Sequence, residues 1–190
     1  MTELIQTPLE ILEAGLESVR QSPKDQGRLE LIVRRPQSLA RESLEAGELD
    51  PIQGLVGDDW VKRPSTRTAD GTPHPDMQIT IMNTRLLALL TQEKNQWELA
   101  GDQLYMDLDL SESNLPAGTR LALGDSVLEI TNQPHTGCVK FSGRFGLDAL
   151  KFISSPAGKE LRLRGIYAKI IQPGAIHVGD LARKIESKTH

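Results

Sequence analysis

Short segments in which apolar and polar residues alternate, separated by glycine and proline, fill most of the chain from residue 28 onward. In the first of them, 28–35, Leu29, Leu31 and Val33 form the apolar series. Alternation with a period of two places such side chains on one face of a β-strand. Many short strands joined by glycine and proline turns favour a barrel or sandwich over parallel strands alternating with helices. We therefore predict a mainly β fold with peripheral helices, an α+β protein built on a barrel-like sheet.

Further strands are predicted wherever this pattern recurs between turn residues. Gly124-Asp125 separates two of them and is typical of a two-residue hairpin turn, because glycine tolerates the backbone angles that such turns require. Pro134 should end the strand before it, because proline has no amide hydrogen to donate to a sheet. The expected strands are 77–82, 104–110, 119–123, 126–131, 162–171 and a short one at 176–178.

Helices are predicted near the N-terminus and in short connections. Thr7-Pro8 combines a capping hydroxyl with a proline at the first helical position, and apolar residues at helical spacing follow through Val19. Asn83 is expected to cap a short helix that runs to Leu90. Weaker helical patterns occur at 37–49 and 147–153.

The pattern divides the chain into three parts. Residues 1–27 form an N-terminal helix and connector, 28–181 a β-barrel domain, and 182–190 a charged tail that we expect to fray. A length of 190 residues suits one domain of this kind. Residues 50–75 form a long connection with several glycines and prolines, and long loops are often functional. We expect this loop along the rim of a functional pocket.

Composition excludes several classes of protein. A single cysteine cannot form an intramolecular disulfide, which argues against a disulfide-stapled secreted scaffold and for the reducing cytoplasm. No segment approaches the roughly 20 apolar residues of a membrane-spanning helix, and the acidic N-terminus lacks a signal-peptide pattern. The net charge is −4, from 22 basic and 26 acidic residues, and no basic cluster occurs. We therefore expect neither nucleic acid nor a membrane as a partner.

The lone cysteine, Cys138, is the residue that most directly suggests chemistry. His135, Lys140 and Arg144 lie close to it in sequence, and positive groups favour the thiolate, which attacks electrophiles and binds metals. An unpaired cysteine is also commonly a small buried apolar residue. Spacing alone favours this second interpretation. The chain contains no phosphate-binding glycine motif, and its four histidines are too dispersed to indicate a metal site.

Several short blocks resemble the MOSC domain, which is named for the C-terminal part of molybdenum-cofactor sulfurase. The resemblance covers roughly residues 28–181, and the order and spacing of the blocks make it fairly specific. The blocks are Gly57-Asp58-Asp59-Trp60, 76–80, 107–111, 115–121, Cys138-Val139-Lys140-Phe141, 165–168 and 173–180.

The resemblance implies a β-barrel of the MOSC type and a role for Cys138 in handling sulfur or molybdenum. In the sulfurase the domain receives sulfur for the cofactor, and in amidoxime-reducing relatives the matching cysteine is a molybdenum ligand beside a bound pterin. Cys138 would then be the sulfur carrier or metal ligand, and the candidates for holding the anionic cofactor are His135, Thr136, Lys140 and Arg144. Either sulfur transfer or molybdenum-dependent oxidoreductase activity would follow, with a sulfur-donor or electron-donor protein as partner.

The sequence also departs from the family. Many members carry Gly-Glu-Asn where this chain has Gly101-Asp102-Gln103, which leaves open a non-catalytic binding module that kept the barrel and lost the cofactor. The aminotransferase domain of the full sulfurase is absent from these 190 residues. Some descriptions of the family mention pyridoxal phosphate. Lys140 or Lys169 would have to form its Schiff base, and we do not expect that cofactor here.

Overall fold

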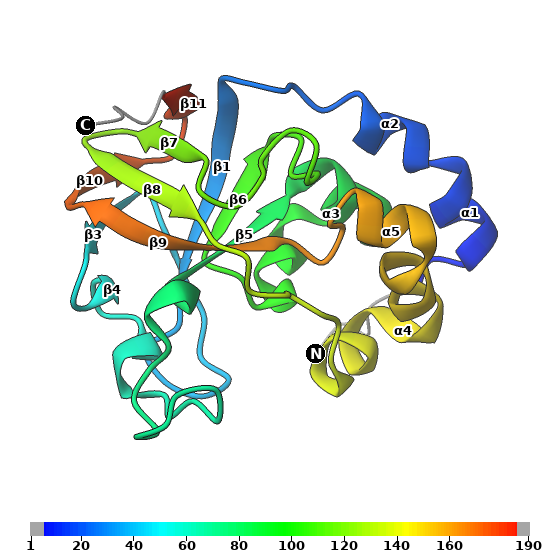
Figure 1. Cartoon of the computed structure of the whole chain (residues 1–190). Helices are drawn as coiled ribbons and strands as arrows, with labels where there is room; N and C mark the ends of the chain where they lie inside the picture. The colour runs from blue at the N-terminus through cyan, green and yellow to red at the C-terminus, as the bar shows by residue number, and fades with distance from the viewer. Residues whose placement is uncertain (1–5, 186–190) are drawn as a thin grey trace.

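A closed ring of seven strands forms the centre of the molecule in the computed structural model, which describes residues 6–185 (Figure 1). Neighbouring strands are antiparallel except β5 and β6, and the pairing of β11 with β1 closes the ring. An eighth strand, β2 (Glu42–Leu44), pairs with β1 outside it. In order around the barrel, the strands are β11 (Leu181–Ile185), β7 (Arg120–Leu123), β8 (Ser126–Ile130), β9 (Ile166–Gln172), β5 (Ile79–Asn83), β6 (Leu104–Asp107) and β1 (Gly27–Arg34). The prediction of a mainly β, barrel-like fold is confirmed.

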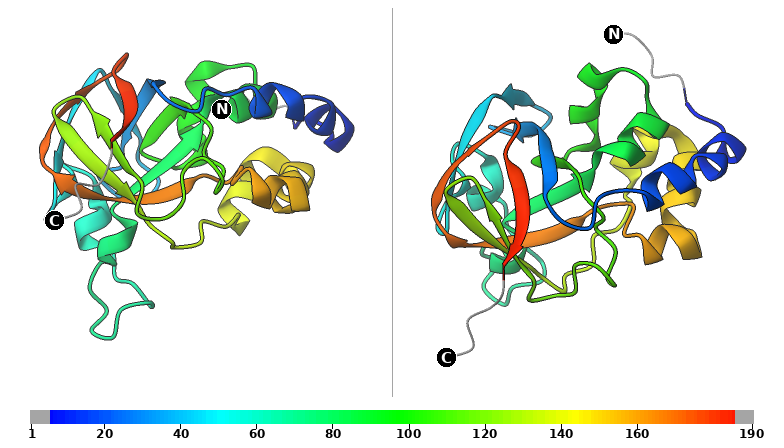
Figure 2. Two further views of the ribbon diagram at one scale, coloured as in Figure 1. Left: turned by 45° about the horizontal axis from the view of Figure 1, so that its top comes forward. Right: turned by 90° about the horizontal axis from the view of Figure 1, so that it is seen from above.

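The helices gather on one side of the barrel, as the two views of Figure 2 also show. The largest, α4 (Val139–Ser154), changes direction at Gly146, whose φ of 92° lies in the left-handed region. The other helices of this layer are α1 (Leu9–Ala14), α2 (Leu16–Arg20), α3 (Thr84–Leu90), η3 (Lys94–Ala100) and α5 (Pro156–Glu160). Within residues 6–185, no helix is both long enough and apolar enough to cross a membrane.

Two hydrophobic clusters hold these layers together. The barrel interior is filled by buried aliphatic side chains and one methionine, as the small number of aromatic residues requires. The second cluster lies between the barrel wall and the helices and takes five of the seven aromatic residues of the chain. These five are Trp97, Tyr105, Phe141, Phe145 and Phe152. The helical layer is therefore attached to the barrel by its bulkiest apolar residues, including two from the first turns of α4.

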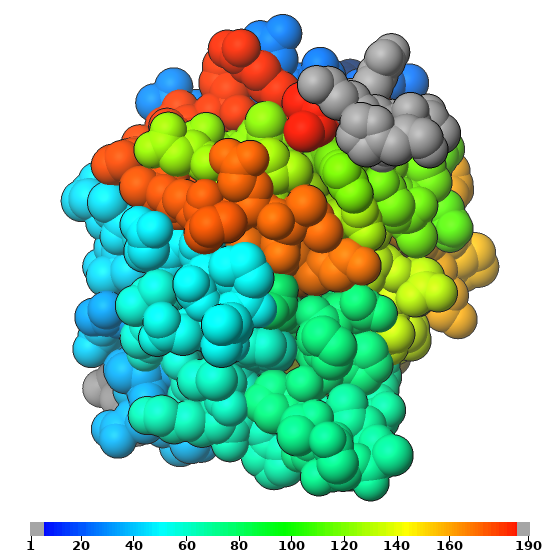
Figure 3. Space-filling model, turned by 60° about the vertical axis from the view of Figure 1, so that its left-hand side comes forward, coloured from blue at the N-terminus to red at the C-terminus, as the bar shows by residue number. Residues whose placement is uncertain are grey.

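A small second sheet and a long loop pack on the barrel away from the helical layer. The sheet consists of β10 (Gly174–His177), β3 (Ala46–Asp50) and β4 (Gly54–Leu55). The loop after β4 contains two 3-10 turns, η1 (Asp59–Lys62) and η2 (Pro75–Met77). Figure 3 shows β3, β4 and the loop, coloured cyan to green, as one continuous surface over the lower part of the face turned toward the viewer.

Several predicted elements are confirmed and others are wrong. The Asn83 side chain caps α3 as expected, accepting hydrogen bonds from the amides of Arg85 (2.8 Å) and Leu86 (3.2 Å). The helix expected at 37–49 is wrong, because this segment supplies β2 and β3, which pair with β1 and β10. The single helix expected through Val19 is two, α1 and α2, separated at Gly15.

The ends of three other elements also differ from expectation. The tail expected to fray from residue 182 instead contains β11, in which Ala182 is fully buried and the outward side chains are charged or exposed. Residues 186–190 lie outside the described residues, as do 1–5 at the start of the predicted N-terminal part. The strand expected from residue 162 begins at Ile166, because Arg162 and Gly165 have positive φ and form a turn. The helix expected at 147–153 is part of the much longer α4.

Candidate functional site

A cavity of about 530 Å³, the first cavity, opens beside Cys138. Its walls come from the end of β1 and the loop that follows, the 50–75 loop, the turn at Ala100-Gly101, and the start of α4. Small-molecule sites typically have volumes of about 300–1,000 Å³. The cavity is therefore large enough for a cofactor-sized ligand.

Positive charge dominates the lining of the first cavity. Among the described residues that line it, Asp59 alone carries a carboxylate. Six lysine and arginine side chains oppose it, although the net charge of the whole chain is −4. They are Arg35, Arg41, Arg63, Lys140, Arg144 and Arg164. A concave site lined by one sign of charge concentrates ligands of the opposite sign, so this cavity favours an anion.

The structure brings most of the predicted site residues to this cavity. Cys138 is exposed, which rules out the alternative of a buried apolar residue, and it lines the cavity together with His135, Lys140 and Arg144. Cys138 is the residue before the first turn of α4, and its extended backbone (φ −127°, ψ 172°) follows the loop that Pro134 begins. Lys140 and Arg144 are four residues apart and therefore share one face of that helix.

Thr136 is the exception among the predicted site residues. It lines a neighbouring cavity of about 400 Å³, the second cavity, and does not line the first. His135 lines both cavities and so belongs to the wall between them.

The long loop lies on the rim of the first cavity, as its length and composition predicted. It contributes an indole, a guanidinium and an imidazole among other side chains. Its residues on the cavity wall are Asp59, Trp60, Arg63, Pro64, Ser65 and His74. Arg63 pairs with Asp59 at 2.6 Å, and Arg35 and Arg164 also have carboxylate partners, so three of the six cations are already paired.

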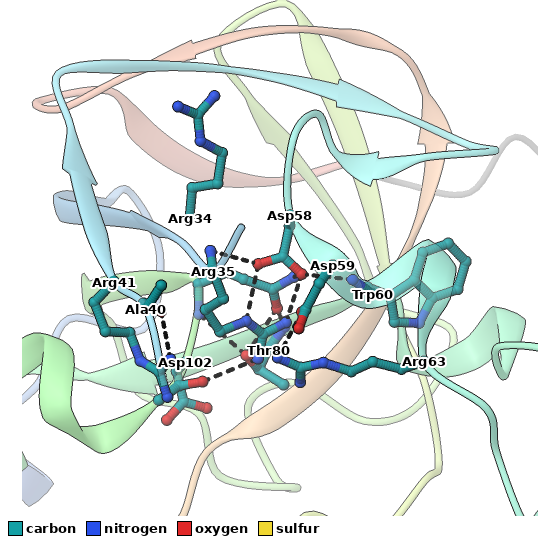
Figure 4. A network of polar contacts seen from close by, with 12 residues as sticks. Arg34, Arg35, Ala40, Arg41, Asp58, Asp59, Trp60, Arg63, Thr80 and Asp102 are labelled. Carbon is teal, nitrogen blue, oxygen red and sulfur yellow. Dashed lines mark hydrogen bonds and ion pairs between the residues drawn. The ribbon is translucent and has the colours of Figure 1, made fainter. Parts of the chain in front are cut away.

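A buried ion pair fixes the loop to the barrel. Asp58 accepts hydrogen bonds from Arg35 Nε (2.8 Å) and Nη2 (2.9 Å), and also from the amides of Arg35 and Trp60. Both side chains are nearly inaccessible, at 7% and 0% exposure. Burial would raise the pKa of Asp58, but the hydrogen bonds and charge of Arg35 outweigh it and hold the pKa below its ordinary value. Figure 4 shows Arg35 pointing into this network, whereas Arg34 points away from it.

A second buried pair holds the wall between the two cavities. Arg164 Nη1 donates to Asp102 Oδ2 at 2.8 Å, and Asp102 is fully buried. The guanidinium of Arg164 also lies 5.2 Å from the ring centroid of Phe141. Asp102 Oδ1 is 3.7 Å from Nδ1 of His135, whose ring packs on Tyr167. Burial raises the pKa of Asp102, although the charge of Arg164 opposes this.

The altered Gly101-Asp102-Gln103 block therefore has a definite place in the site. Gly101 lines the first cavity, and its φ of 89° is in the region that favours glycine. Gln103 is fully buried and donates from Nε2 to Asp58 Oδ1 (3.3 Å). Asp102 thus belongs to one of the two buried ion pairs, and Gln103 donates a hydrogen bond to the other. The block therefore stabilises the wall of the first cavity through these ion pairs. Sequence reasoning did not predict this role.

His135 should make stability depend on pH. Burial, aided by the charges of Arg164 and Arg35, holds the pKa of His135 well below its ordinary value of 6.5. The folded protein then keeps the imidazole neutral while the unfolded chain takes up a proton, so the free energy of unfolding falls as pH falls below 6.5. Between pH 7 and 5.5 this contribution is about 1 kcal/mol.

Urea unfolding of the wild type and His135→Gln at both pH values measures this effect. The wild type should lose about 1 kcal/mol more than the variant between the two conditions. Equal losses in the two proteins would show that His135 titrates alike in the folded and unfolded states. Far-ultraviolet circular dichroism before unfolding checks that the variant is folded.

Several residues of the site were missed by sequence reasoning. Arg35, Arg41, Arg63 and Arg164 are far from Cys138 in sequence, and arginines at the ends of strands and in loops carry no local signal of a site. Within residues 6–185, no group of three or more His, Cys, Asp or Glu side chains is arranged to hold a metal ion.

Comparisons with known proteins agree with this fold. The sequence model of the MOSC domain matches residues 71–183. YiiM from Escherichia coli has 19% sequence identity and a TM-score of 0.54, with 86% of this chain and 72% of YiiM covered. The YuaD protein from Bacillus subtilis has 16% identity and a TM-score of 0.57, with 84% and 97% covered. A comparison with curated proteins found no match. At these identities the structural likeness concerns the fold alone.

Proposed function

Because the chain belongs to the MOSC domain family, we propose that its first cavity binds the molybdenum cofactor, with Cys138 as the ligand from the protein. The observation that carries this proposal is the concentration of six cationic side chains around a cavity whose wall includes an exposed thiol. The cofactor is a phosphate-bearing pterin and therefore an anion. Charge-assisted hydrogen bonds from guanidinium to phosphate are among the strongest in proteins.

The donor groups of the cavity fit such a ligand. Within residues 6–185, Arg41, Lys140 and Arg144 have no carboxylate partner, and Arg41 donates only to a backbone carbonyl. Nε of Arg41 and Nε of Arg164 are buried without a hydrogen-bond partner in the same part of the chain. Leaving such donors unpaired is costly. An anion bound in the cavity would relieve this cost.

Cys138 suits the metal for reasons of chemistry and position. Thiolate is a soft ligand, and soft ligands select metals that form sulfur-rich sites. When bound, the cofactor supplies two-electron redox chemistry at molybdenum. The chain's own part would be to hold the anion with Arg41, Lys140 and Arg144, to offer the thiol, and to place neutral His135 beside the ligand. We propose that any oxidoreductase activity takes its electrons from a separate donor protein in the cytoplasm.

A sulfur carrier is the second candidate, and the exposure of Cys138 favours it. A persulfide on Cys138 needs an accessible thiol, but it does not need a cofactor-sized cavity with six cationic residues. The binding-module alternative rested on the altered Gly101-Asp102-Gln103 block. Because that block supports the two buried ion pairs, its change is compatible with a working site.

Analysis of protein purified gently from cells that make the cofactor tests the proposal. We expect molybdenum at about one atom per chain and a pterin released on denaturation. A mass increase of one sulfur atom that reductant removes, without molybdenum or pterin, would replace the proposal by the sulfur carrier. Folded protein that contains neither molybdenum, pterin nor the additional sulfur atom would favour the non-catalytic binding module over both other functions.

A further inference from the structure

The second cavity is not used by the proposed function. It has a volume of about 400 Å³ and shares only His135 and Arg164 with the first cavity. Its other walls come from the 131–137 segment, the end of α4, α5 and the turn before β9. The volume is again in the range of small-molecule sites. The shared wall side chains are about nine-tenths buried, with side-chain exposures of 8% for His135 and 10% for Arg164.

The polar lining of the second cavity has a positive charge that is only partly balanced. Arg162 contacts Glu112 at 3.5 Å, but the Glu112 side chain is 77% exposed, so this pair is weak. Within residues 6–185, Lys159 on the same wall forms no ion pair. Nδ1 of His135, on the wall that the two cavities share, is buried and lacks a hydrogen-bond partner in this part of the chain. The lining therefore favours a negatively charged ligand.

The position of Arg162 is fixed by the backbone. Its φ of 48° lies in the left-handed region, which costs a residue other than glycine about 1 kcal/mol or more and is often found at functional sites. Its amide donates to the carbonyl of Lys159, and its Nη1 donates to the carbonyl of Leu115 at 2.8 Å. These bonds hold the guanidinium at the cavity without occupying all of its donors.

The remaining walls suit a ligand with an apolar body. Pro134, Ile153 and Ile166 contribute apolar surface. The exposed side chains of Asn132 and Thr136 also line the cavity and can hydrogen-bond to a ligand. An inorganic anion would leave the apolar walls uncovered, and a purely apolar ligand would leave the donors unused. The lining therefore fits a small molecule that has both an anionic group and an apolar body.

We propose that the second cavity is a separate binding site for a small organic acid. The carboxylate would lie toward Arg162 and Lys159, the apolar body against Ile153 and Ile166, and Thr136 would donate a hydrogen bond from the 131–137 segment. This assignment gives Thr136 a role in the second cavity instead of in cofactor binding. It does not depend on the cofactor proposal, because the two sites share only their common wall.

Binding of benzoate, with uncharged benzamide as the matched control, tests this site in the full chain. Backbone amide resonances of Gly137, Gly158 and Gly165 report on the second cavity, because these glycines line it and not the first. Gly101 reports on the first cavity in the same spectrum. We expect benzoate to shift the first three resonances at a lower concentration than Gly101, and benzamide to bind about tenfold more weakly, as loss of a charged hydrogen bond implies.

Two variants locate the ligand. Arg162→Gln should weaken benzoate binding at the three glycines by about tenfold, and Lys159→Gln should weaken it less, because this exposed lysine is a flexible point charge. Arg41→Gln, which removes a cation of the first cavity alone, should leave those shifts unchanged. The site is contradicted if benzamide binds as well as benzoate, if Arg41→Gln abolishes the shifts, or if the three resonances do not move. These outcomes are independent of whether molybdenum or pterin is found.

Discussion

Replacing Asp58 by asparagine should lower the free energy of unfolding by about 3–5 kcal/mol, the usual effect of removing one partner of a buried ion pair. Arg35 would keep its charge in a place where only 7% of its side chain is exposed. Its remaining bond, from Nη1 to the carbonyl of Gly101 at 3.0 Å, cannot replace a carboxylate. The amides of Arg35 and Trp60 donate to different oxygens of Asp58, and asparagine would keep only one of these two acceptors.

The matched control is the neighbouring pair on the surface. Arg34 and Glu42 approach to 2.6 Å, yet their side chains are 35% and 45% exposed. Glu42→Gln should therefore change stability by less than about 1 kcal/mol. Urea unfolding of both variants at pH 7 measures the difference. Similar small losses in both would mean that the Arg35–Asp58 pair does not hold the loop to the barrel.

A double variant separates the unpaired charge from lost packing. Arg35→Met with Asp58→Leu removes both charges and keeps comparable volume, and such replacements are often neutral or stabilising. It should recover part of the stability lost in Asp58→Asn, although Trp60 still loses its capping bond. If Asp58→Asn does not fold, a folded double variant would still identify the isolated charge as the cause. A double variant as unstable as the single one would contradict that cause.

Neutralising Arg41 and Arg144 together should lower the pterin content of purified protein by about tenfold or more. Each charged hydrogen bond contributes about 1.5–3 kcal/mol, so losing two reduces affinity by about 100-fold or more. Both arginines line the first cavity, and within residues 6–185 neither has a carboxylate partner. The measurement is bound pterin per chain in the wild type and in Arg41→Gln with Arg144→Gln. Pterin content equal to that of the wild type would remove these residues from the site.

The same double variant should not lose stability without cofactor. Burial, together with the positive charges of Arg144 and Arg35, holds the pKa of Arg41 below its ordinary value, so the charged cluster is unfavourable by itself. Removing two members relieves repulsion between like charges, which offsets the loss of the hydrogen bonds that Arg41 and Arg144 donate to the carbonyls of Ala40 and Leu99. Arg34→Gln is the control for loss of an arginine, because its side chain points away from the network (Figure 4). A loss of binding with unchanged stability would distinguish a ligand-binding role from a structural one.

Local sequence patterns predicted the parts of the fold that depend on local physics. Alternation identified most of the strands, and the Asn83 side chain was recognised as a helix cap because the cap acts within three residues. The strand β11 was missed because its outward side chains are charged or exposed, so its sequence resembles a solvated tail. Its pairing with β1 closes the barrel across the whole length of the chain, and no local pattern encodes such a contact.

The candidate site was predictable only around Cys138. His135, Lys140 and Arg144 are within six residues of it, and the turn into α4 keeps them near the thiol. The buried pairs join residues that are 23 positions apart for Arg35 and Asp58 and 62 apart for Arg164 and Asp102. The residues of each pair become neighbours only when the barrel forms and brings together segments that are distant in sequence. Before the fold is known, Asp58 and Asp102 have the same local signature as ordinary surface carboxylates.

X-ray absorption at the molybdenum edge, on the wild type and on Cys138→Ser purified from cofactor-producing cells, is the most direct test of the central claim. Cys138 is exposed on the wall of the first cavity, so its replacement by the similar serine should leave the fold and most anion contacts in place. We predict molybdenum in the wild type with one sulfur neighbour more than in the variant. Identical sulfur coordination in the two proteins, or folded wild-type protein without molybdenum, would contradict the assignment of Cys138 as the metal ligand.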